Sequence, residues 1–315
     1  MGTAFLTGFE TGEPSLKRKG IRPERGIAQV EPTDGGAPNF GRGDFCGRGD
    51  LSLARWEDPR TFPHDRMDAA EYANISSLEA EHWYYSGKRR FVREWIQKVR
   101  PPGLEDVLLD CGAGTGRFAE EMSAQCRVFV LDDHEEALKL LHQRFRPEQI
   151  FSLAGDRVPL PDGSLEYVTA LDVLEHVPDD RAVVSGFHRL LKPGGIAVVT
   201  VSASRALWSD WDVALHHFRR YDRAELRALF PTSEWEVLHV NYTNVLAFPV
   251  VWAVRKWRVW RRSVGMRPSG RQRSEDRVPA RALNTLLRAQ LVRLAHWRVP
   301  FPFGVGLILV ARRRA

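Results

Sequence analysis

The chain has 315 residues, of which 43% are apolar and 27% charged, and it carries a formal net charge of +6. This length and apolar content suffice for the buried core of one large or two small domains. Its three cysteines, Cys46, Cys111 and Cys126, show no paired or clustered spacing, which excludes a disulfide framework and a cysteine-ligated cluster. Because there is no run of about 18 apolar residues and no basic start followed by an apolar core, we expect neither a spanning helix nor export.

The charge is distributed unevenly along the chain. Residues 244–315 contain 16 Lys and Arg against 2 Asp and Glu, a net +14, whereas residues 67–243 contain 20 against 28, a net −8. A basic lobe attached to an acidic domain predicts a polyanionic or membrane-surface partner for that lobe.

Residues 1–66 are rich in glycine, proline and charge and show no sustained hydrophobic period. We expect this segment to be disordered. Its near-repeat at residues 41–44 and 47–50 resembles an adhesion motif, but chance low complexity in an intracellular tail explains it better. Since Met67 opens a stretch typical of a natural protein start, an over-called extension is a further hypothesis, which normal activity of a chain beginning at Met67 would support.

Residues 67–103 form an entry region, and the spacing of their apolar residues predicts two helices between residues 68 and 100. One helical face gathers Phe91, Val92, Trp95 and Ile96. This pattern is typical of an amphipathic helix that packs on a domain. An aromatic segment that includes Tyr84 precedes it, and the basic residues Lys88 and Arg89 follow.

An apolar run that begins at Val107 stops at Asp110 and is followed by glycines at positions 112, 114 and 116. Buried parallel strands have this composition, and a glycine turn at the carboxyl end lets backbone approach a ligand closely. The pattern therefore predicts a site for a nucleotide-like cofactor. The dinucleotide fingerprint G-x-G-x-x-G needs its third glycine at position 117, where Arg117 stands, so nicotinamide binding is disfavoured.

Four further segments follow this turn in order. A strand over residues 128–131 ends at Asp132, and Gly155-Asp156-Arg157 precedes the segment Leu160 to Ser164. A strand over Leu165–Leu171 leads to Glu175 and His176, and a turn at residues 189–195 leads to an apolar strand at 196–201. Together with residues 110–116, these segments resemble the class I S-adenosylmethionine-dependent methyltransferases. The resemblance implies an α/β fold with a doubly wound, Rossmann-like seven-stranded sheet.

The resemblance also implies S-adenosylmethionine as the cofactor and S-adenosylhomocysteine as its product. Asp132 is the carboxylate that would take both ribose hydroxyls, since an ionised carboxylate only accepts hydrogen bonds. The N-terminal helices would form a lid over the methionine end, where Arg89 or Lys88 meets the cofactor carboxylate. The implied cofactor contacts are Asp110, Gly112, Ala113, Gly114, Gly116, Asp132, Asp133, Asp156, Arg157, Leu171, Tyr84 and Arg89.

Residues 206–221 contain an LWS...D...H.RRY pattern, which resembles a segment of a methyltransferase type 11-like bacterial subfamily over about residues 67–312. Two arginines beside a tyrosine can bind a phosphate or carboxylate, so the expected acceptor contacts are Trp208, Arg219, Arg220 and Tyr221. The alternative is that the two arginines pair with Asp210 and Asp212 and pin a loop. Because the adjacent residues His216 and His217 lack metal-ligand spacing, we expect no metal.

The basic insertion over residues 244–303 precedes the last strand and basic tail, residues 304–315, and residues 104–243 form the cofactor domain. Residues 245–262 and 283–297 predict two amphipathic helices. In the first, Val250, Trp257 and Trp260 share a face, with arginines at 255, 258 and 262 on another. Either this helix lies at a membrane interface, or it packs on the domain with its arginines in water.

Methyl transfer from a sulfonium is an in-line displacement, so alignment supplies much of the catalysis. If a general base is needed, His176 is the first candidate, because it follows the fourth strand and can be neutral at pH 7. Glu175, His217 and Tyr221 are the reserves. A structural role for His176 is the alternative.

The expected protein is a cytoplasmic methyltransferase that acts on a small-molecule or lipid-linked acceptor, with peripheral contact at the inner membrane face. One alternative is a nucleic-acid or protein methyltransferase that docks through the basic lobe, which lacks an accompanying RNA-binding motif. Another is an inactive, cofactor-binding regulatory subunit. The intact glycines of the turn and Asp132 argue against a degenerate site.

Overall fold

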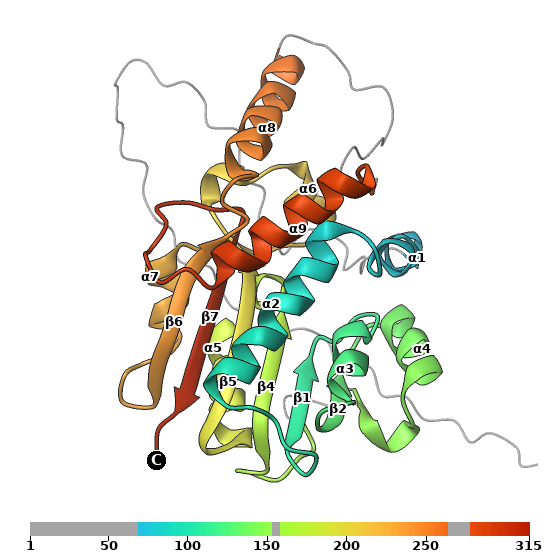
Figure 1. The fold of residues 1–315 in the computed structure, drawn as a ribbon, viewed down its shortest axis with the longest axis vertical. Helices are drawn as coiled ribbons and strands as arrows, with labels where there is room; N and C mark the ends of the chain where they lie inside the picture. The colour runs from blue at the N-terminus through green and yellow to red at the C-terminus, as the bar shows by residue number, and fades with distance from the viewer. Residues whose placement is uncertain (1–68, 153–157, 264–277) are drawn as a thin grey trace, which may run out of the picture. The chain divides into compact units, whose positions relative to one another are not determined.

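The computed structural model describes residues 69–152, 158–263 and 278–315. Within these residues, seven strands form one sheet in the order β3-β2-β1-β4-β5-β7-β6 (Figure 1). The strands are β1 (Val107–Cys111), β2 (Arg127–Leu131), β3 (Ile150–Phe151), β4 (Leu165–Leu171), β5 (Leu191–Ser202), β6 (Trp235–Thr243) and β7 (Gly306–Arg313).

Strands β1 to β5 pair in parallel, and β7 runs antiparallel to both of its neighbours, β5 and β6. The carboxyl ends of β1 to β6 therefore share one edge of the sheet. The strand order reverses between β1 and β4, and open α/β sheets bind ligands at such a switch point. The predicted seven-stranded, doubly wound sheet with an antiparallel last strand is confirmed.

Helices cover both faces of the sheet (Figure 1). One apolar cluster joins α2, α3, α4 and α9 to the sheet, and a second cluster joins α5 and α7 to it. The helices are α1 (Ala69–Leu78), α2 (Trp83–Val99), α3 (Arg117–Met122), α4 (Glu135–Arg144), α5 (Asp180–Leu190), α6 (Asp210–Ala214), α7 (Arg223–Ala228), α8 (Phe248–Ser263) and α9 (Arg281–Ala295).

Helix α2 packs between the sheet and the predicted insertion. Its apolar residues Phe91, Val92, Trp95 and Ile96 are buried, as their spacing predicts. The Trp95 indole donates to the Ala295 carbonyl at 3.1 Å, which ties α2 to the end of α9. At the other end of this contact, the Asn284 side chain accepts from the Trp83 backbone amide at 2.9 Å. Helix α9 therefore holds the entry helix in place on the sheet.

Helix α8 follows β6 at the carboxyl edge of the sheet and rises from it in Figure 1, where it is orange. Its orientation differs from the predicted cap helix with its arginines in water. Arg255 is buried against the domain, whereas Val250 and Trp257 are 65% and 52% exposed. The face expected to pack is the face that meets solvent.

Some predictions fall outside the described residues, namely the disorder of residues 1–66 and the cofactor contacts of Asp156 and Arg157. The two-residue strand β3 was not predicted, because two residues carry no period. In the described part of the chain, no helix combines the length and apolar character needed to cross a membrane.

Candidate active site

The glycine turn after β1 adopts backbone angles that favour glycine. Gly112, Gly114 and Gly116 have φ values of +66°, +56° and +78°, in the left-handed region. A Cβ on Gly112 would lie 2.5 Å from a Val173 methyl group, whereas one on Gly114 would meet no described atom within 4 Å. The first glycine therefore permits close packing, and the second leaves an open cradle at the sheet edge.

Asp132 faces this cradle from the end of β2. Its carboxylate accepts a hydrogen bond from the Gly114 amide at 2.8 Å and one from the His134 amide at 3.0 Å. Burial raises the pKa of Asp132, and the two amide hydrogen bonds act in the opposite direction. The carboxylate is thus fixed beside the turn, with acceptor capacity left for a ligand hydroxyl.

Asp110 lies behind the turn, at the carboxyl end of β1. Its side chain is almost fully buried and accepts a hydrogen bond from the Thr169 hydroxyl at 2.7 Å. Burial raises the pKa of Asp110 to about 7, with a smaller contribution in the same direction from Asp132. Two carboxyl groups with different surroundings therefore stand at neighbouring strand ends.

These features fit the adenosine part of S-adenosylmethionine. The open space at Gly114 admits a ligand, and the Asp132 carboxylate is placed to accept from vicinal hydroxyls. Ala113 is part of the same turn, its amide bonded to the Leu131 carbonyl at 3.0 Å. Asp133 is exposed after β2, and Leu171 ends β4 at the same edge.

Helix α2 reaches the end of β4 through Lys88. The Lys88 ammonium forms an ion pair with Asp172 and lies 4.3 Å from the centre of the Tyr84 ring. Burial alone would lower the pKa of Lys88, but the Asp172 carboxylate raises it above the usual range. Asp172 also accepts from the Thr200 hydroxyl at 2.9 Å. Tyr84 and Lys88 thus lie at the end of β4, on the sheet edge that also carries Gly114 and Asp132 (the cofactor edge).

Arg89 points elsewhere, because it pairs with Glu121 of α3 at 2.9 Å. In this structure Lys88 is nearer to the cofactor edge, and Arg89 ties α2 to α3.

Two segments that are distant in sequence meet beyond Asp172. Glu175 and His176 follow β4, and His217 follows α6, yet the rings of the two histidines lie 4.5 Å apart at 88°. Burial and the neighbouring His217 lower the pKa of His176 to about 4. Three of the four predicted base candidates, Glu175, His176 and His217, therefore form one cluster, and His176 is neutral at physiological pH.

Asp212 holds this cluster together by pairing with three side chains. Its carboxylate lies 3.0 Å from His217 Nδ1, 2.5 Å from Arg220 Nε and 3.2 Å from Arg255 Nη1. It is fully buried, and the hydrogen bond with His217 and the charges of Arg220 and Arg255 lower its pKa to about 2 despite that burial. Asp212 of α6 is therefore ionised at neutral pH and joins its own helix to α8 through Arg255.

The two arginines of the H.RRY segment are bonded to other groups of the protein. Arg220 is buried against Asp212, while Arg219 pairs with Asp180 at 2.7 Å and donates to the Pro178 carbonyl. The structure therefore favours the alternative in which the two arginines pin a loop over the one in which they bind an anionic acceptor. The partner of Arg219 is Asp180 and not Asp210.

Tyr221 is likewise internal, its hydroxyl 2.7 Å from Asp180 Oδ2 and 3.1 Å from the Leu174 carbonyl. Burial and Asp180 raise the pKa of Tyr221 well above its usual range. This environment disfavours the ionised form that a base would need. Trp208 remains half-buried at the start of the segment.

Sequence reasoning gave Asp212 only as a partner that pins the arginine loop. It missed the Lys88–Asp172 pair and Arg255 as a site residue. The aspartate of the LWS...D...H.RRY pattern was a signal for Asp212, because a serine three residues before an acid predicts a capping box. Ser209 and Asp212 form that box at the start of α6. Nothing local in the sequence marked Arg255, which reaches Asp212 from 43 residues away.

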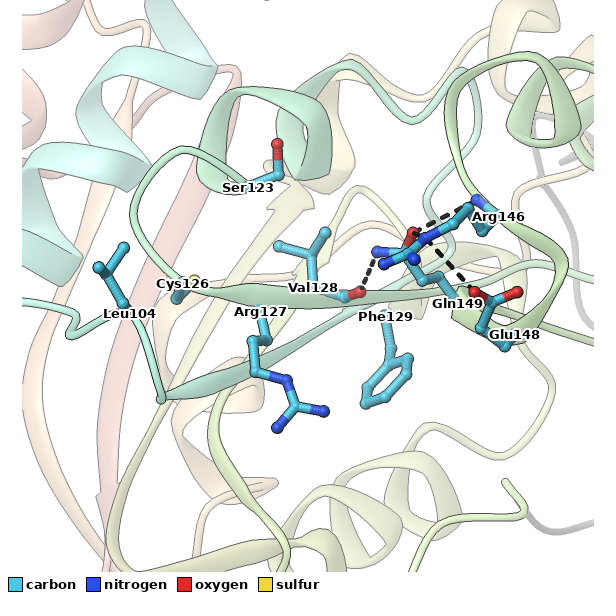
Figure 2. A pocket seen from close by; sticks show the side chains of 9 residues that line it. All are labelled: Leu104, Ser123, Cys126, Arg127, Val128, Phe129, Arg146, Glu148 and Gln149. Carbon is cyan, nitrogen blue, oxygen red and sulfur yellow. Dashed lines mark hydrogen bonds and ion pairs between the residues drawn. The ribbon is translucent and has the colours of Figure 1, made fainter.

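A cavity of about 580 Å³ lies away from this site. Figure 2 shows its lining residues around the start of β2, with the Gln149 amide bonded to the Val128 carbonyl. Leu104 precedes β1 and Arg127 begins β2, so the cavity borders the amino ends of these strands. It is separate from the edge that carries Asp110 and Asp132.

Comparisons with known proteins agree with this geometry. Residues 109–199 match the family described as a methyltransferase domain. Over 169 residues the chain is 31% identical to the ubiquinone biosynthesis O-methyltransferase of Idiomarina loihiensis, and the match covers 48% of this chain and 68% of that one. The chain belongs to the S-adenosylmethionine-dependent methyltransferase family.

Other relatives match over shorter shares. The chain is 34% identical over 142 residues to the ubiquinone biosynthesis O-methyltransferase of Thiobacillus denitrificans, covering 41% of this chain and 61% of the relative. A solved S-adenosylmethionine-dependent methyltransferase of Thermotoga maritima is 15% identical, with a TM-score of 0.50, over 78% of this chain and 96% of that one. The chain spans about half to three fifths of the length of several curated relatives.

Proposed function

We propose that the protein transfers a methyl group from S-adenosylmethionine to a lipid-linked small molecule at a membrane surface. The observation that carries the methyl-transfer part is the Asp132 carboxylate, fixed by the Gly114 amide at 2.8 Å beside an open glycine cradle. When bound, the cofactor supplies an electrophilic methyl group on a sulfonium. The protein aligns the two reactants and excludes water.

The residues around the end of β4 define the acceptor side in this proposal. Lys88 and Tyr84 cover the cofactor edge, while Glu175, His176 and His217 gather beyond Asp172. Neutral imidazole can accept a proton from a hydroxyl or amine acceptor. The protein's own ion pairs hold Arg219 and Arg220, so we assign them a positioning role and give acceptor contact to the histidines.

A membrane-surface acceptor is supported first by helix α8. Trp252 and Trp257 are 44% and 52% exposed, and the neighbouring residues Lys256 and Arg258 are also exposed. Aromatic side chains beside basic ones are typical of helices that lie in a lipid interface. The net +14 of residues 244–315 adds attraction to anionic lipid.

The relatives' names give a second line of support. Several are named for ubiquinone biosynthesis, and one, from Geobacillus stearothermophilus, is named demethylmenaquinone methyltransferase. Both names refer to apolar quinones. An apolar acceptor that resides in a bilayer fits an enzyme whose exposed tryptophans follow β6 at the cofactor edge.

Methyl-labelled S-adenosylmethionine, incubated with the protein and fractionated extract, tests the acceptor class. We expect label in the organic, lipid-containing fraction. Label in RNA, DNA or protein would instead support the alternative in which the basic lobe docks a macromolecule. Cofactor binding without transfer to any fraction would support the inactive regulatory subunit and would overturn the proposal.

Co-sedimentation with anionic phosphatidylglycerol-containing vesicles tests the surface separately. Trp252→Ser and Trp257→Ser together should lower the bound fraction severalfold. Trp297→Ser is the matched control, because Trp297 is as exposed as Trp252, at 44%, but follows α9 instead of lying on α8. Equal binding by wild type and the double variant would contradict the assignment of α8.

A further inference from the structure

Glu175, His176 and His217 converge although their segments are about forty residues apart in sequence. Each offers one possible ligand atom, and these three atoms all lie within 4.8 Å of one another. A backbone hydrogen bond from the Phe218 amide to the Glu175 carbonyl, at 2.7 Å, fastens the two segments together. The cluster is therefore a fixed part of the fold.

The Glu175 carboxylate is only half satisfied. Its Oε1 atom accepts from the Ser202 amide at 2.8 Å, while Oε2 is buried without a hydrogen-bond partner among the described residues. Glu175 has no exposed surface. An unpaired buried carboxylate oxygen is costly, and a cation at Oε2 would remove that cost.

Each histidine ring has a hydrogen-bond partner outside the cluster. His217 Nδ1 lies 3.0 Å from the buried Asp212 carboxylate, and the His176 ring has a backbone hydrogen bond with Leu215. Metal-binding histidines nearly always have such a partner, a carboxylate or a backbone carbonyl, on the second nitrogen. Because His217 Nδ1 has this partner, its Nε2 is the nitrogen left to bind an ion.

We propose that Glu175, His176 and His217 bind one divalent transition-metal ion of the zinc class, with an open position for the acceptor's oxygen. Two imidazoles and one carboxylate form a donor set of open, catalytic zinc sites. Sequence spacing did not reveal this set, because the usable histidines are 176 and 217 and not the adjacent pair 216 and 217. The role toward the acceptor rests on the proposed methyl transfer, whereas the metal site itself does not.

Such an ion would assist a hydroxyl acceptor. With an ion bound, His176 and His217 would be its ligands and no longer the proton acceptor. The metal would lower the pKa of the acceptor hydroxyl, which would then release its proton to water. The acceptor oxygen would then form the new C–O bond while the C–S bond breaks and its electron pair stays on sulfur. The site would thus act on oxygen acceptors.

Direct metal binding tests the site without any turnover. The full chain, purified without a polyhistidine tag and treated with chelator, is titrated with Zn²⁺ by calorimetry and with Co²⁺ by visible absorption. We expect about one equivalent of either ion and intense Co²⁺ bands typical of a four-coordinate site. Glu175→Gln and His217→Ala should each lower Zn²⁺ affinity at least tenfold.

His216→Asn is the matched control, since His216 is exposed and its left-handed backbone, at φ +55°, suits asparagine. It should bind Zn²⁺ like wild type. Circular dichroism and thermal unfolding of each variant separate lost ligands from lost folding. Less than a tenth of an equivalent of zinc in the wild type, or unchanged affinity in folded His217→Ala and Glu175→Gln, would overturn the proposal.

Titration of S-adenosylmethionine into the same samples distinguishes the two failures. Cofactor binding without zinc binding would remove the metal site and leave the methyltransferase proposal intact. Zinc binding without cofactor binding would contradict the methyltransferase proposal and leave the metal site intact.

Discussion

The cofactor edge and the acceptor-side cluster occupy neighbouring strand ends, but they are assembled in opposite ways. The first is built from one stretch of chain, residues 110–132, whose key contact joins Gly114 and Asp132 across two adjacent strands. In the second, the buried carboxylate of Asp212 joins residues 209–221 to Arg255, and the hydrogen bond from the Phe218 amide to the Glu175 carbonyl adds residues 172–176. Local turns build the first site, whereas tertiary ion pairing builds the second.

Loss of Asp212 should show this difference most strongly. Asp212→Ala leaves Arg220 and Arg255 buried without their carboxylate, so we expect a loss of about 3–5 kcal/mol in the free energy of unfolding. Urea denaturation measures it. Asp162→Ala is the control, because Asp162 pairs with Arg189 at the surface and its loss should cost about 1 kcal/mol or less. Equal losses in the two variants would mean that Asp212 does not organise the cluster.

Two glycines of one turn offer a sharper contrast. Gly112→Ala combines left-handed strain with a 2.5 Å approach to Val173 and should cost about 2–4 kcal/mol of folding stability. Gly114→Ala keeps only the strain, about 1–2 kcal/mol, but its methyl group enters the open cradle. We therefore expect Gly114→Ala to lose more cofactor affinity than stability. Equal stability losses in thermal and urea unfolding would contradict this reading of the turn.

Asp110 gives the cofactor edge a pH dependence. Burial raises the pKa of Asp110 from 3.8 to about 7, so the folded protein retains a proton that the unfolded chain releases. The contribution of this group to stability is thus full below about pH 4 and is lost as pH rises through 7. Asp110→Asn cannot ionise and should keep more of its stability between pH 5 and pH 8, by up to a few kcal/mol relative to wild type.

The exposed Asp133, also at this edge, provides the control. Asp133→Asn should follow the wild-type pH profile of the melting temperature. A wild-type profile for Asp110→Asn would show that this carboxyl is ionised throughout and that its environment is wetter than its burial suggests.

The sequence predicted the fold well because its signals are local. The apolar run before Asp110, the glycine turn and the alternation of strands and helices each depend on residues within one turn or strand. The two-residue strand β3 was not predicted, since its pairing with β2 defines it and its own sequence has no strand pattern.

The candidate site was predictable only in part. The cofactor residues Gly112, Gly114 and Asp132 come together wherever the fold forms. The sequence left the orientation of α8 open between an interfacial helix and a packed cap helix. It could not decide between them, because Arg255 is buried by a partner 43 residues away and this leaves the apolar side of the helix at the surface. Ion pairs between distant segments determine which face of such a helix is buried, and hydrophobic periodicity does not reveal those ion pairs.

Cofactor binding to Asp132 variants tests the central claim most directly. Calorimetric titration of S-adenosylmethionine should give one site in the wild type, weakened by about 1–3 kcal/mol in Asp132→Ala as expected for a lost hydrogen-bonding carboxylate. The exposed neighbour variant Asp133→Ala should retain more of the affinity, provided that both proteins melt like wild type. Unchanged affinity in a folded Asp132→Ala protein would contradict the placement of the cofactor at the end of β2.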